Sequence, residues 1–179
     1  MLCLRPMNPH AALARKVAQV SLLQGTFRLR SGATSSEYFD KYRFEAEPTI
    51  LREIAEQLAM LLPKDFDVLA GLEMGGIPIA TMLSQLTGTP ALFIRKKAKQ
   101  YGTCRFAEGG DVNGRRLLVI EDVVTSGGQI IESVGALRNE GAIIANVACV
   151  IDRGAGGRVN LQSHGLALTS LFSMADLKE

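Results

Sequence analysis

Short apolar runs alternate with stretches of helical periodicity from Asp67 to Leu171, and this order constrains the fold more than any other feature. Strands that alternate with helices form a mostly parallel sheet with right-handed crossovers and helices on its faces. The longest apolar run, 143–151, is typical of a strand buried on both faces. We therefore expect an α/β fold with strands at 67–71, 91–95, 117–124, 143–151 and 166–171 and helices at 76–86 and 129–139.

The N-terminal part is expected to differ from this core. Asn8 can cap a helix whose first position is Pro9, and the helical pattern runs to Leu23 before Gly25 stops it. Residues 26–44 alternate around a turn rich in Ser and Gly, and they are rich in aromatic residues. This pattern predicts a small β hairpin, or hood, above the core.

The remaining segments complete one predicted domain over residues 1–179. Pro48 opens a second helix that ends before Pro63, residues 96–110 look irregular, and the tail is expected to form a short helix. A chain of 179 residues is long enough for one core and short for two. The expected parts are the N-terminal helix and hood at 1–45 and the core at 46–179.

Composition excludes some classes of protein. The chain is 47% hydrophobic and 21% charged, as soluble globular proteins are, and its net charge of +2 is too small to indicate nucleic-acid binding. No apolar run approaches membrane-spanning length, and the first residues lack the apolar region of a signal peptide. We expect no nucleic-acid or membrane partner.

The cysteines and histidines exclude others. Cys3, Cys104 and Cys149 are scattered and odd in number, which predicts neither a disulfide framework nor a metal site and fits a cytoplasmic protein. His10 and His164 are the only histidines, and neither lies near a convincing Ser or Cys nucleophile. A hydrolytic triad is therefore not expected.

Residues 117–129 carry the most specific pattern. An apolar run ends at Glu121 and Asp122, and the small residues 125–128 follow directly before a helical pattern. Such a loop can arrange backbone N–H groups around an anion at a helix N-terminus, whereas the acids suit hydroxyl groups or a metal ion. A phosphorylated sugar satisfies both halves; two surface carboxylates at a strand end are the alternative. Ser126 and Gln129 also have the spacing of a capping box.

Other charged groups fall at the same edge of the predicted sheet. Ligands of open α/β sheets bind beyond the carboxyl ends of the strands, where the loop 71–76 and Arg153 lie beside the acid pair. The pattern lacks the Gly-Lys-Ser/Thr of a P-loop and the spacing of a dinucleotide fingerprint. A basic segment follows the strand 91–95, which suits a diphosphate, although a solvated basic loop is the alternative. Its cations are Arg95, Lys96, Lys97 and Lys99.

Residues 117–129 resemble the phosphoribosyl-diphosphate signature of the phosphoribosyltransferases that share the type I α/β fold. Further segments narrow the resemblance to the orotate phosphoribosyltransferases, from about Phe27 to Arg153. Residues 27–40 resemble the hood of that family, and residues 71–80 resemble its diphosphate loop. Residues 95–102 resemble the start of its mobile catalytic loop, which is expected here at 96–110. Residues 151–153 resemble a strand end that supplies an arginine for the carboxylate of orotate.

The resemblance implies a role for each segment. Lys99, Glu121 and Asp122 would be the catalytic residues, with the acids holding ribose hydroxyls directly or through Mg²⁺, which the diphosphate would carry near them. Arg153, Thr125 and Arg30 would contact orotate. Phosphoribosyl diphosphate would be held by Arg95, Lys96, Lys99, Glu121, Asp122, Val123, Val124, Thr125, Ser126, Gly127, Gly128 and Gln129.

The implied reaction joins orotate to phosphoribosyl diphosphate and gives orotidine 5′-phosphate and diphosphate in pyrimidine biosynthesis, in a homodimer whose subunits share the mobile loop. Two positions depart from the best-known pattern: Gly75 stands where many relatives have a diphosphate-contacting lysine, and Tyr101 stands where many have histidine. The alternatives are a phosphoribosyltransferase for another base and a non-catalytic regulator that senses phosphoribosyl diphosphate.

Overall fold

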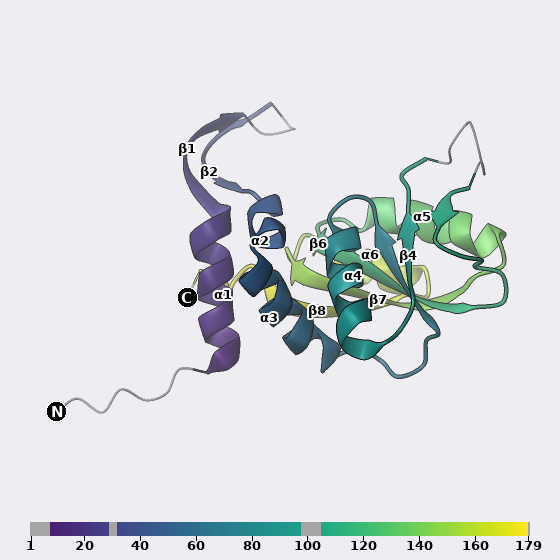
Figure 1. Cartoon of the computed structure of the whole chain (residues 1–179). Coiled ribbons are helices and arrows are strands. Elements are labelled where there is room, and N and C mark those ends of the chain that lie inside the picture. The colour runs from purple at the N-terminus through teal and green to yellow at the C-terminus, as the bar shows by residue number, and fades with distance from the viewer. Residues whose placement is uncertain (1–7, 29–31, 98–104, 179) are drawn as a thin grey trace.

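A computed structural model describes residues 8–28, 32–97 and 105–178 (Figure 1). Its main sheet has six strands in the order β5-β4-β3-β6-β7-β8, and neighbouring strands run parallel except at β5, which pairs antiparallel with β4. The expected α/β class with a mostly parallel sheet is confirmed. The strands are β3 (Val68–Leu72), β4 (Ala91–Ile94), β5 (Ala107–Glu108), β6 (Arg116–Val124), β7 (Ile143–Asp152) and β8 (Ala167–Ser173).

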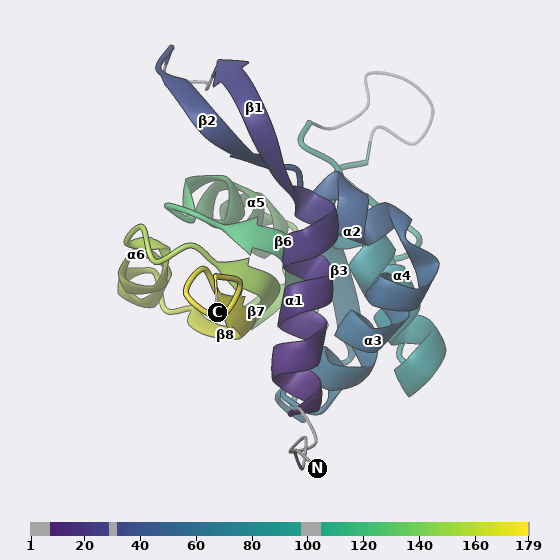
Figure 2. The same cartoon turned by 90° about the vertical axis from the view of Figure 1, so that its left-hand side faces the viewer.

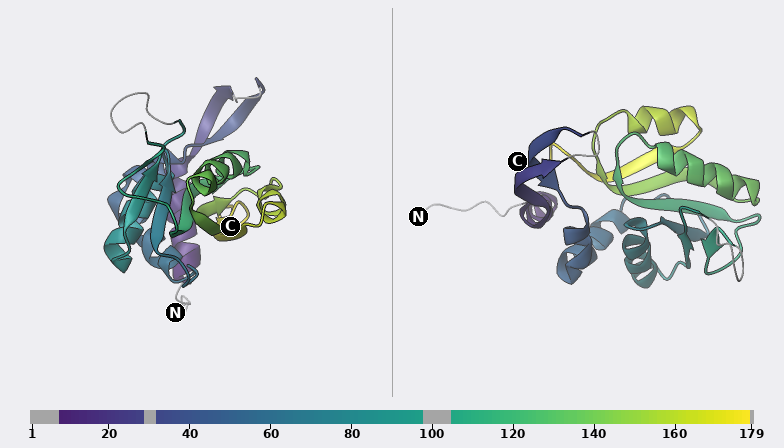
Figure 3. Two further views of the ribbon diagram at one scale, coloured as in Figure 1. Left: turned by 90° about the vertical axis from the view of Figure 1, so that its right-hand side faces the viewer. Right: turned by 90° about the horizontal axis from the view of Figure 1, so that it is seen from above.

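Helices cover both faces of this sheet, as the view from above shows (Figure 3). One face carries α3 and α4 with α1 beside them, and the other carries α5 and α6. Within the described ranges no helix has the length and apolar character needed to cross a membrane. The helices are α1 (Pro9–Ser21), α2 (Tyr42–Ala46), α3 (Pro48–Ala59), α4 (Gly76–Thr87), α5 (Gly128–Asn139) and α6 (Gly157–Ser163).

The strand sequences account for this double covering. In β6, Leu118 and Ile120 belong to the core shared with α1, α3 and α4, whereas Leu117 and Val119 belong to the core beneath α5 and α6. Successive side chains of a strand point to opposite faces, so an uninterrupted apolar run supplies both cores. The long apolar run of β7 does the same, and its central residues are fully buried.

The hood is a separate two-stranded antiparallel sheet of β1 (Leu22–Arg28) and β2 (Thr34–Phe39). It rises from the end of α1 and stands away from the main sheet (Figure 2). The first helix ends at Ser21, so the predicted extension to Leu23 was wrong. The predicted hairpin 26–44 was also too long at its C-terminal end, because residues 42–46 form α2.

A buried aromatic residue explains why α2 forms. Phe44 is completely buried in the core with α1 and α3, and its ring lies 6.4 Å from that of Phe39. Placing Phe44 in the core turns the chain into a helical segment before Pro48 begins α3. The predicted border between hood and core at residue 45 therefore falls inside α2.

Three further segments differ from expectation. Residues 96–110 are not irregular throughout, because Ala107 and Glu108 form the edge strand β5. The helix α6 follows β7 where no helix was predicted. The tail forms turns instead of a helix; Asp176 accepts hydrogen bonds from the backbone N–H and the hydroxyl of Ser173.

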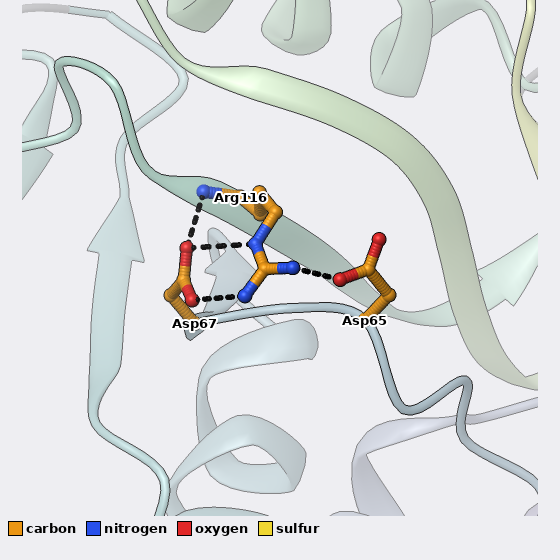
Figure 4. Close-up of polar contacts among 3 residues, drawn as sticks. All are labelled: Asp65, Asp67 and Arg116. Carbon is orange, nitrogen blue, oxygen red and sulfur yellow. Dashed lines mark hydrogen bonds and ion pairs between the residues drawn. The ribbon is translucent and has the colours of Figure 1, made fainter.

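An arginine links two strands at the amino-terminal edge of the sheet (Figure 4). The guanidinium of Arg116, the first residue of β6, donates to Asp67 at 2.7 and 3.1 Å and also contacts Asp65. The backbone N–H of Arg116 donates to the same Asp67 carboxylate at 2.9 Å. Since the carboxyl ends of β3 and β6 lie at the opposite edge, this ion-pair cluster is far along the strands from the predicted ligand site.

Candidate active site

A cleft of about 320 Å³ opens at the carboxyl edge of the sheet, where the loops after β3 and β6 meet α2. Its volume is in the range of small-molecule sites. The cleft is lined by Lys41, Tyr42, Glu73, Met74, Lys96, Glu121, Val123, Val124, Thr125, Ser126, Gly127, Gly128, Gln129 and Ile130. The structure thus brings most of the predicted phosphoribosyl-diphosphate residues into one cavity.

The phosphate loop, residues 125–127, joins β6 to α5. Gly127 is the N-cap residue of α5 with φ of +76°, a conformation that glycine adopts without strain. The helix begins at Gly128, one residue earlier than predicted, and its N-cap makes no side-chain hydrogen bond. The capping box predicted for Ser126 and Gln129 is therefore wrong. The first backbone N–H groups of a helix have no partner within it, and Gly128, Gln129 and Ile130 of this first turn line the cleft. The start of α5 can therefore serve as an anion site.

The phosphate loop is supported from behind by α6, which the sequence pattern did not reveal. Asn160 donates a side-chain hydrogen bond to the backbone oxygen of Ser126 at 2.8 Å. A Cβ at Gly157 would lie 2.5 Å from the backbone oxygen of Thr125, and one at Gly127 would lie 3.1 Å from Leu161. These close approaches fix the loop against α6. The sequence signal for α6 was the pair Gly156-Gly157 followed by Asn160. The segment was not predicted as a helix because it is short.

The two acids of β6 point to different surroundings. Glu121 lines the cleft, where its carboxylate can accept hydrogen bonds from a ligand. The Asp122 side chain is completely buried, and its Oδ2 lies 2.6 Å from Nζ of Lys41. Adjacent residues of a strand face opposite sides, so the pair divides into one carboxylate in the cleft and one beneath it. Ligand contact by Asp122 itself stays a prediction.

Lys41, directly before α2, and Glu45, within α2, complete a buried charged cluster with the two acids. Burial, then the hydrogen bond with Asp122, raise the pKa of Glu45 to about 9, so Glu45 is protonated at neutral pH and donates to Asp122. Burial opposes ionisation of Asp122, but hydrogen bonds from Glu121, Lys41 and Glu45 outweigh it and hold its pKa below the ordinary value. Burial also raises the pKa of Glu121, with a further contribution from Asp122.

Sequence reasoning missed this cluster because it placed residues 42–44 in a hairpin. Lys41 and Glu45 are four residues apart, which puts their side chains on the same face of a helix. That spacing, directly before Pro48, was the available signal. Without the helix the two residues would have pointed in unrelated directions.

The loop after β3 approaches β6 so closely that only glycine fits. A Cβ at Gly76 would lie 2.2 Å from the backbone oxygen of Ile120, and one at Gly75 would lie 1.7 Å from Oδ2 of Asp122. The side chain of Glu73 accepts a hydrogen bond from the backbone N–H of Lys96 at 2.9 Å. This bond ties the loop after β3 to the start of the basic segment after β4.

Arg95 and Arg153 are predicted site residues that the structure describes, and neither is among the residues that line the cleft. The side chain of Arg95 lies 3.8 Å from Glu108 of the edge strand β5. Arg153 is exposed; its backbone N–H donates to the oxygen of Val124, so its side chain begins beside the phosphate loop. Arg30 and Lys99 lie outside the described residues, as does Tyr101.

Comparison with known proteins identifies the family. The family model of the phosphoribosyl transferase domain matches residues 42–163. The chain is 50% identical over 171 residues to an orotate phosphoribosyltransferase of a Nocardioides species, covering 96% of each chain. It is 39% identical over 153 residues to the orotate phosphoribosyltransferase of Halobacterium salinarum, covering 86% of this chain and 87% of that one.

Solved structures agree with these matches. The structure superposes on Mycobacterium tuberculosis orotate phosphoribosyltransferase in complex with Fe(III) dicitrate with a TM-score of 0.87 and 32% identity, covering 96% of this chain and 100% of that one. The same enzyme in complex with 5-phospho-α-D-ribosyl 1-diphosphate gives a TM-score of 0.82 and 30% identity, with coverage of 96% and 100%. The chain therefore belongs to the phosphoribosyltransferase family and, within it, to the orotate phosphoribosyltransferases.

Proposed function

We propose that this chain transfers the phosphoribosyl group from 5-phospho-α-D-ribose 1-diphosphate to orotate, giving orotidine 5′-phosphate and diphosphate. The observation that carries the proposal is the single cleft that joins an anion site at the start of α5 to the carboxylate of Glu121. A sugar with a phosphate at one end and hydroxyl groups beside it matches both parts. The relatives named as orotate phosphoribosyltransferases support the choice of orotate as acceptor.

The 5-phosphate would bind at residues 125–129, which line the cleft and offer backbone N–H groups and the hydroxyls of Thr125 and Ser126 as donors. Glu121 would accept hydrogen bonds from the ribose hydroxyls. Burial, with a further contribution from Asp122, raises the pKa of Glu121 above its ordinary value.

The chemistry needs charge stabilisation more than a reactive side chain. A bond forms between the base nitrogen and C1 of the ribose while the bond from C1 to the diphosphate oxygen breaks, and the electron pair of that bond leaves with the diphosphate. The proton of the base nitrogen passes to the departing diphosphate or to water. The sugar gains positive charge, which the carboxylate of Glu121 can stabilise, and the leaving group gains negative charge. Lys96 lines the cleft, and Lys99 would join it as the second cation for the diphosphate.

Mg²⁺ is part of the proposal as a cation carried by the diphosphate. The carboxylates of Glu73 and Glu121 line the cleft and are oxygen ligands of the type that Mg²⁺ prefers. The ion would neutralise the charge that develops on the leaving diphosphate. These two side chains would hold it, directly or through water.

Arg153 would bind the carboxylate of orotate through a bidentate fork, with Thr125 and Arg30 completing the pocket. Changing Arg153 to Ala should raise the KM for orotate about 10- to 100-fold, because one charge-assisted contact contributes about 1.5 to 3 kcal/mol. The KM for phosphoribosyl diphosphate should change less than about 2-fold. Steady-state kinetics with each substrate varied in turn measures both constants.

The control is Arg52→Ala, which removes the same charge from an exposed ion pair on α3 and should leave both constants unchanged. Equal losses for the two substrates in Arg153→Ala would show that this arginine does not recognise the carboxylate.

One assay tests the proposed function against its alternatives. The protein is incubated with phosphoribosyl diphosphate, Mg²⁺ and one base at a time, and the loss of each base is followed. Consumption of orotate supports the proposal, whereas consumption of hypoxanthine or adenine without orotate would overturn it in favour of a phosphoribosyltransferase for another base. No turnover combined with tight nucleic-acid binding would identify a regulator.

We further propose a cytoplasmic homodimer in which a loop at 96–110 completes the site of the partner. The hood supports a partner surface, since an isolated two-stranded hairpin is marginally stable and most residues of β1 and β2 are exposed or half-buried. Phe27 and Tyr38 stack across the hood with their rings 5.5 Å apart, and Tyr38 remains 44% exposed. A second subunit would cover this aromatic pair.

A further inference from the structure

Lys41 lies at the cleft without a role in the reaction described above. It directly precedes α2, which Phe44 anchors in the core, so the backbone at Lys41 is fixed. Its ammonium lies 2.6 Å from Oδ2 of Asp122. The Lys41 side chain keeps 33% of its surface exposed while that of Asp122 has none, so the carboxylate lies beneath the ammonium and the ammonium reaches the cleft.

The ammonium also lies next to the space that a side chain at position 75 would enter. An ideal Cβ on Gly75 would lie 1.7 Å from Oδ2 of Asp122 and 2.7 Å from Oε1 of Glu45. The contact with Lys41 is made by that same Asp122 oxygen. Glycine at position 75 is therefore required for Asp122 to reach Lys41, and Lys41 occupies the region beside the loop after β3.

The remaining hydrogen-bond capacity of Lys41 is open to a ligand. An ammonium has three N–H donors, and among the described residues its ion-pair partner is Asp122. Of the described residues that line the cleft, Lys41 and Lys96 are the cations. A diphosphate needs several cations, and Lys41 lines the same cleft as Lys96 and as Glu73 and Met74 of the loop after β3.

We propose that Lys41 binds the diphosphate group of phosphoribosyl diphosphate in its own subunit, at the place where Gly75 supplies no side chain. Asp122 and Glu45 are then positioning residues that hold the ammonium from below. The inference rests on the proposed function for the identity of the ligand. Asp122, the buried acid of the pair, would then act by holding Lys41 and would need no direct contact with the sugar.

The test is to change Lys41 to Met and measure the dissociation constants of three probes by calorimetry: phosphoribosyl diphosphate, inorganic diphosphate and ribose 5-phosphate. Loss of one charge-assisted contact should weaken the first two about 10-fold or more and ribose 5-phosphate less than about 2-fold. The Lys41→Arg variant should retain most of the affinity. Lys16→Met, which removes a surface lysine paired with Glu53, is the matched control.

Equal weakening of all three probes would overturn the inference, because it would make Lys41 only the counter-ion that keeps Asp122 in place. No weakening of any probe would overturn it as well. If Lys41→Met does not fold, as judged by its melting curve, the same comparison is made with Lys41→Gln, which keeps a hydrogen-bond donor but no charge. Turnover of orotate by the unaltered protein is measured separately, so failure of the proposed function is distinguishable from failure of the Lys41 contact.

Discussion

The buried cluster of Lys41, Glu45, Glu121 and Asp122 shows how neighbouring carboxyl groups acquire different charge states. Burial opposes ionisation of Asp122, but hydrogen bonds with the other three groups outweigh it and lower its pKa, whereas burial raises the pKa of Glu45 to about 9. Three buried carboxylates beside one ammonium would otherwise repel each other in a poorly solvated place. A protonated Glu45 reduces the negative charge beside Lys41, which is the arrangement of lower energy.

This charge state predicts how stability depends on pH. The ordinary pKa of Glu45 is 4.5, so between pH 4.5 and about 9 the folded chain keeps a proton that the unfolded chain releases. The contribution of Glu45 to stability is full below pH 4.5 and is lost as pH rises to about 9. The lowered pKa of Asp122 acts in the opposite direction and only in acid, where stability is lost as that carboxylate becomes protonated.

Glu45→Gln should flatten the fall in unfolding free energy between pH 5 and pH 9, since glutamine donates to Asp122 without titrating. Chemical denaturation at pH 5, 7 and 9 measures the effect. The same substitution at Glu56, an exposed residue of α3, should reproduce the profile of the unaltered protein. Parallel profiles for Glu45→Gln and the unaltered protein would mean that Glu45 is already ionised in the folded state.

At the scale of elements, the phosphate loop depends on a helix that lies 30 residues further along the chain. The short helix α6 approaches the loop through Gly157 and holds Ser126 through Asn160. Backbone N–H groups bind an anion well only when they are held in position before the ligand arrives. We therefore regard Asn160 as a positioning residue for the 5-phosphate site.

Asn160→Ala should raise the KM for phosphoribosyl diphosphate about 5-fold, because a typical hydrogen bond contributes about 1 kcal/mol. The kcat should change less than the KM if the loop closes around the bound ligand. Steady-state kinetics measures both, together with the unfolding free energy. Arg116→Met, at the opposite edge of the sheet, is the contrasting variant: it should cost about 1 kcal/mol of stability or less with unchanged kinetics.

An Asn160→Ala variant that loses stability as Arg116→Met does, yet keeps its KM, would leave Asn160 with a structural role only.

At the scale of the whole molecule, the parallel sheet collects residues from distant segments at one edge. The loops after β3, β4, β6 and β7 all leave the sheet there, and α2 adds Lys41 from the N-terminal part. The opposite edge carries the ion pairs of Arg116 instead. The substrate-binding residues and the ion pairs that link strands thus lie at opposite ends of the same strands. Ligands of open α/β sheets generally bind at the carboxyl ends.

The proposed sharing of a loop between subunits can be tested by mixing two variants, Lys99→Ala and Arg153→Ala. The assay uses orotate at a concentration far below the KM of Arg153→Ala, where both variants turn over little substrate. Random pairing makes half of the dimers mixed, and each mixed dimer holds one intact site, so about a quarter of the original rate should return. Activity is measured before and after the variants are unfolded and refolded together. A mixture that regains nothing would indicate that each site is built within one subunit.

Much of this arrangement was predictable from order along the chain. The strand, acid pair, phosphate loop and helix of residues 117–139 lie next to one another in sequence, and hydrophobic periodicity is a local property that a single strand or helix expresses. The α/β class followed from the same alternation. The edge at which Glu121 and the phosphate loop meet the loop after β3 followed from the parallel order of the strands.

Three features of the site could not be predicted from the sequence, because contacts between distant segments determine them. The helix α2 exists because Phe44 finds a place in the core, and only then do Lys41 and Glu45 meet Asp122, which lies about eighty residues away. The support of the phosphate loop by α6 and the division of Glu121 and Asp122 between cleft and interior also require packed neighbours. Burial and partner distance determine a carboxyl group's charge state, and neither is encoded in any short stretch of sequence.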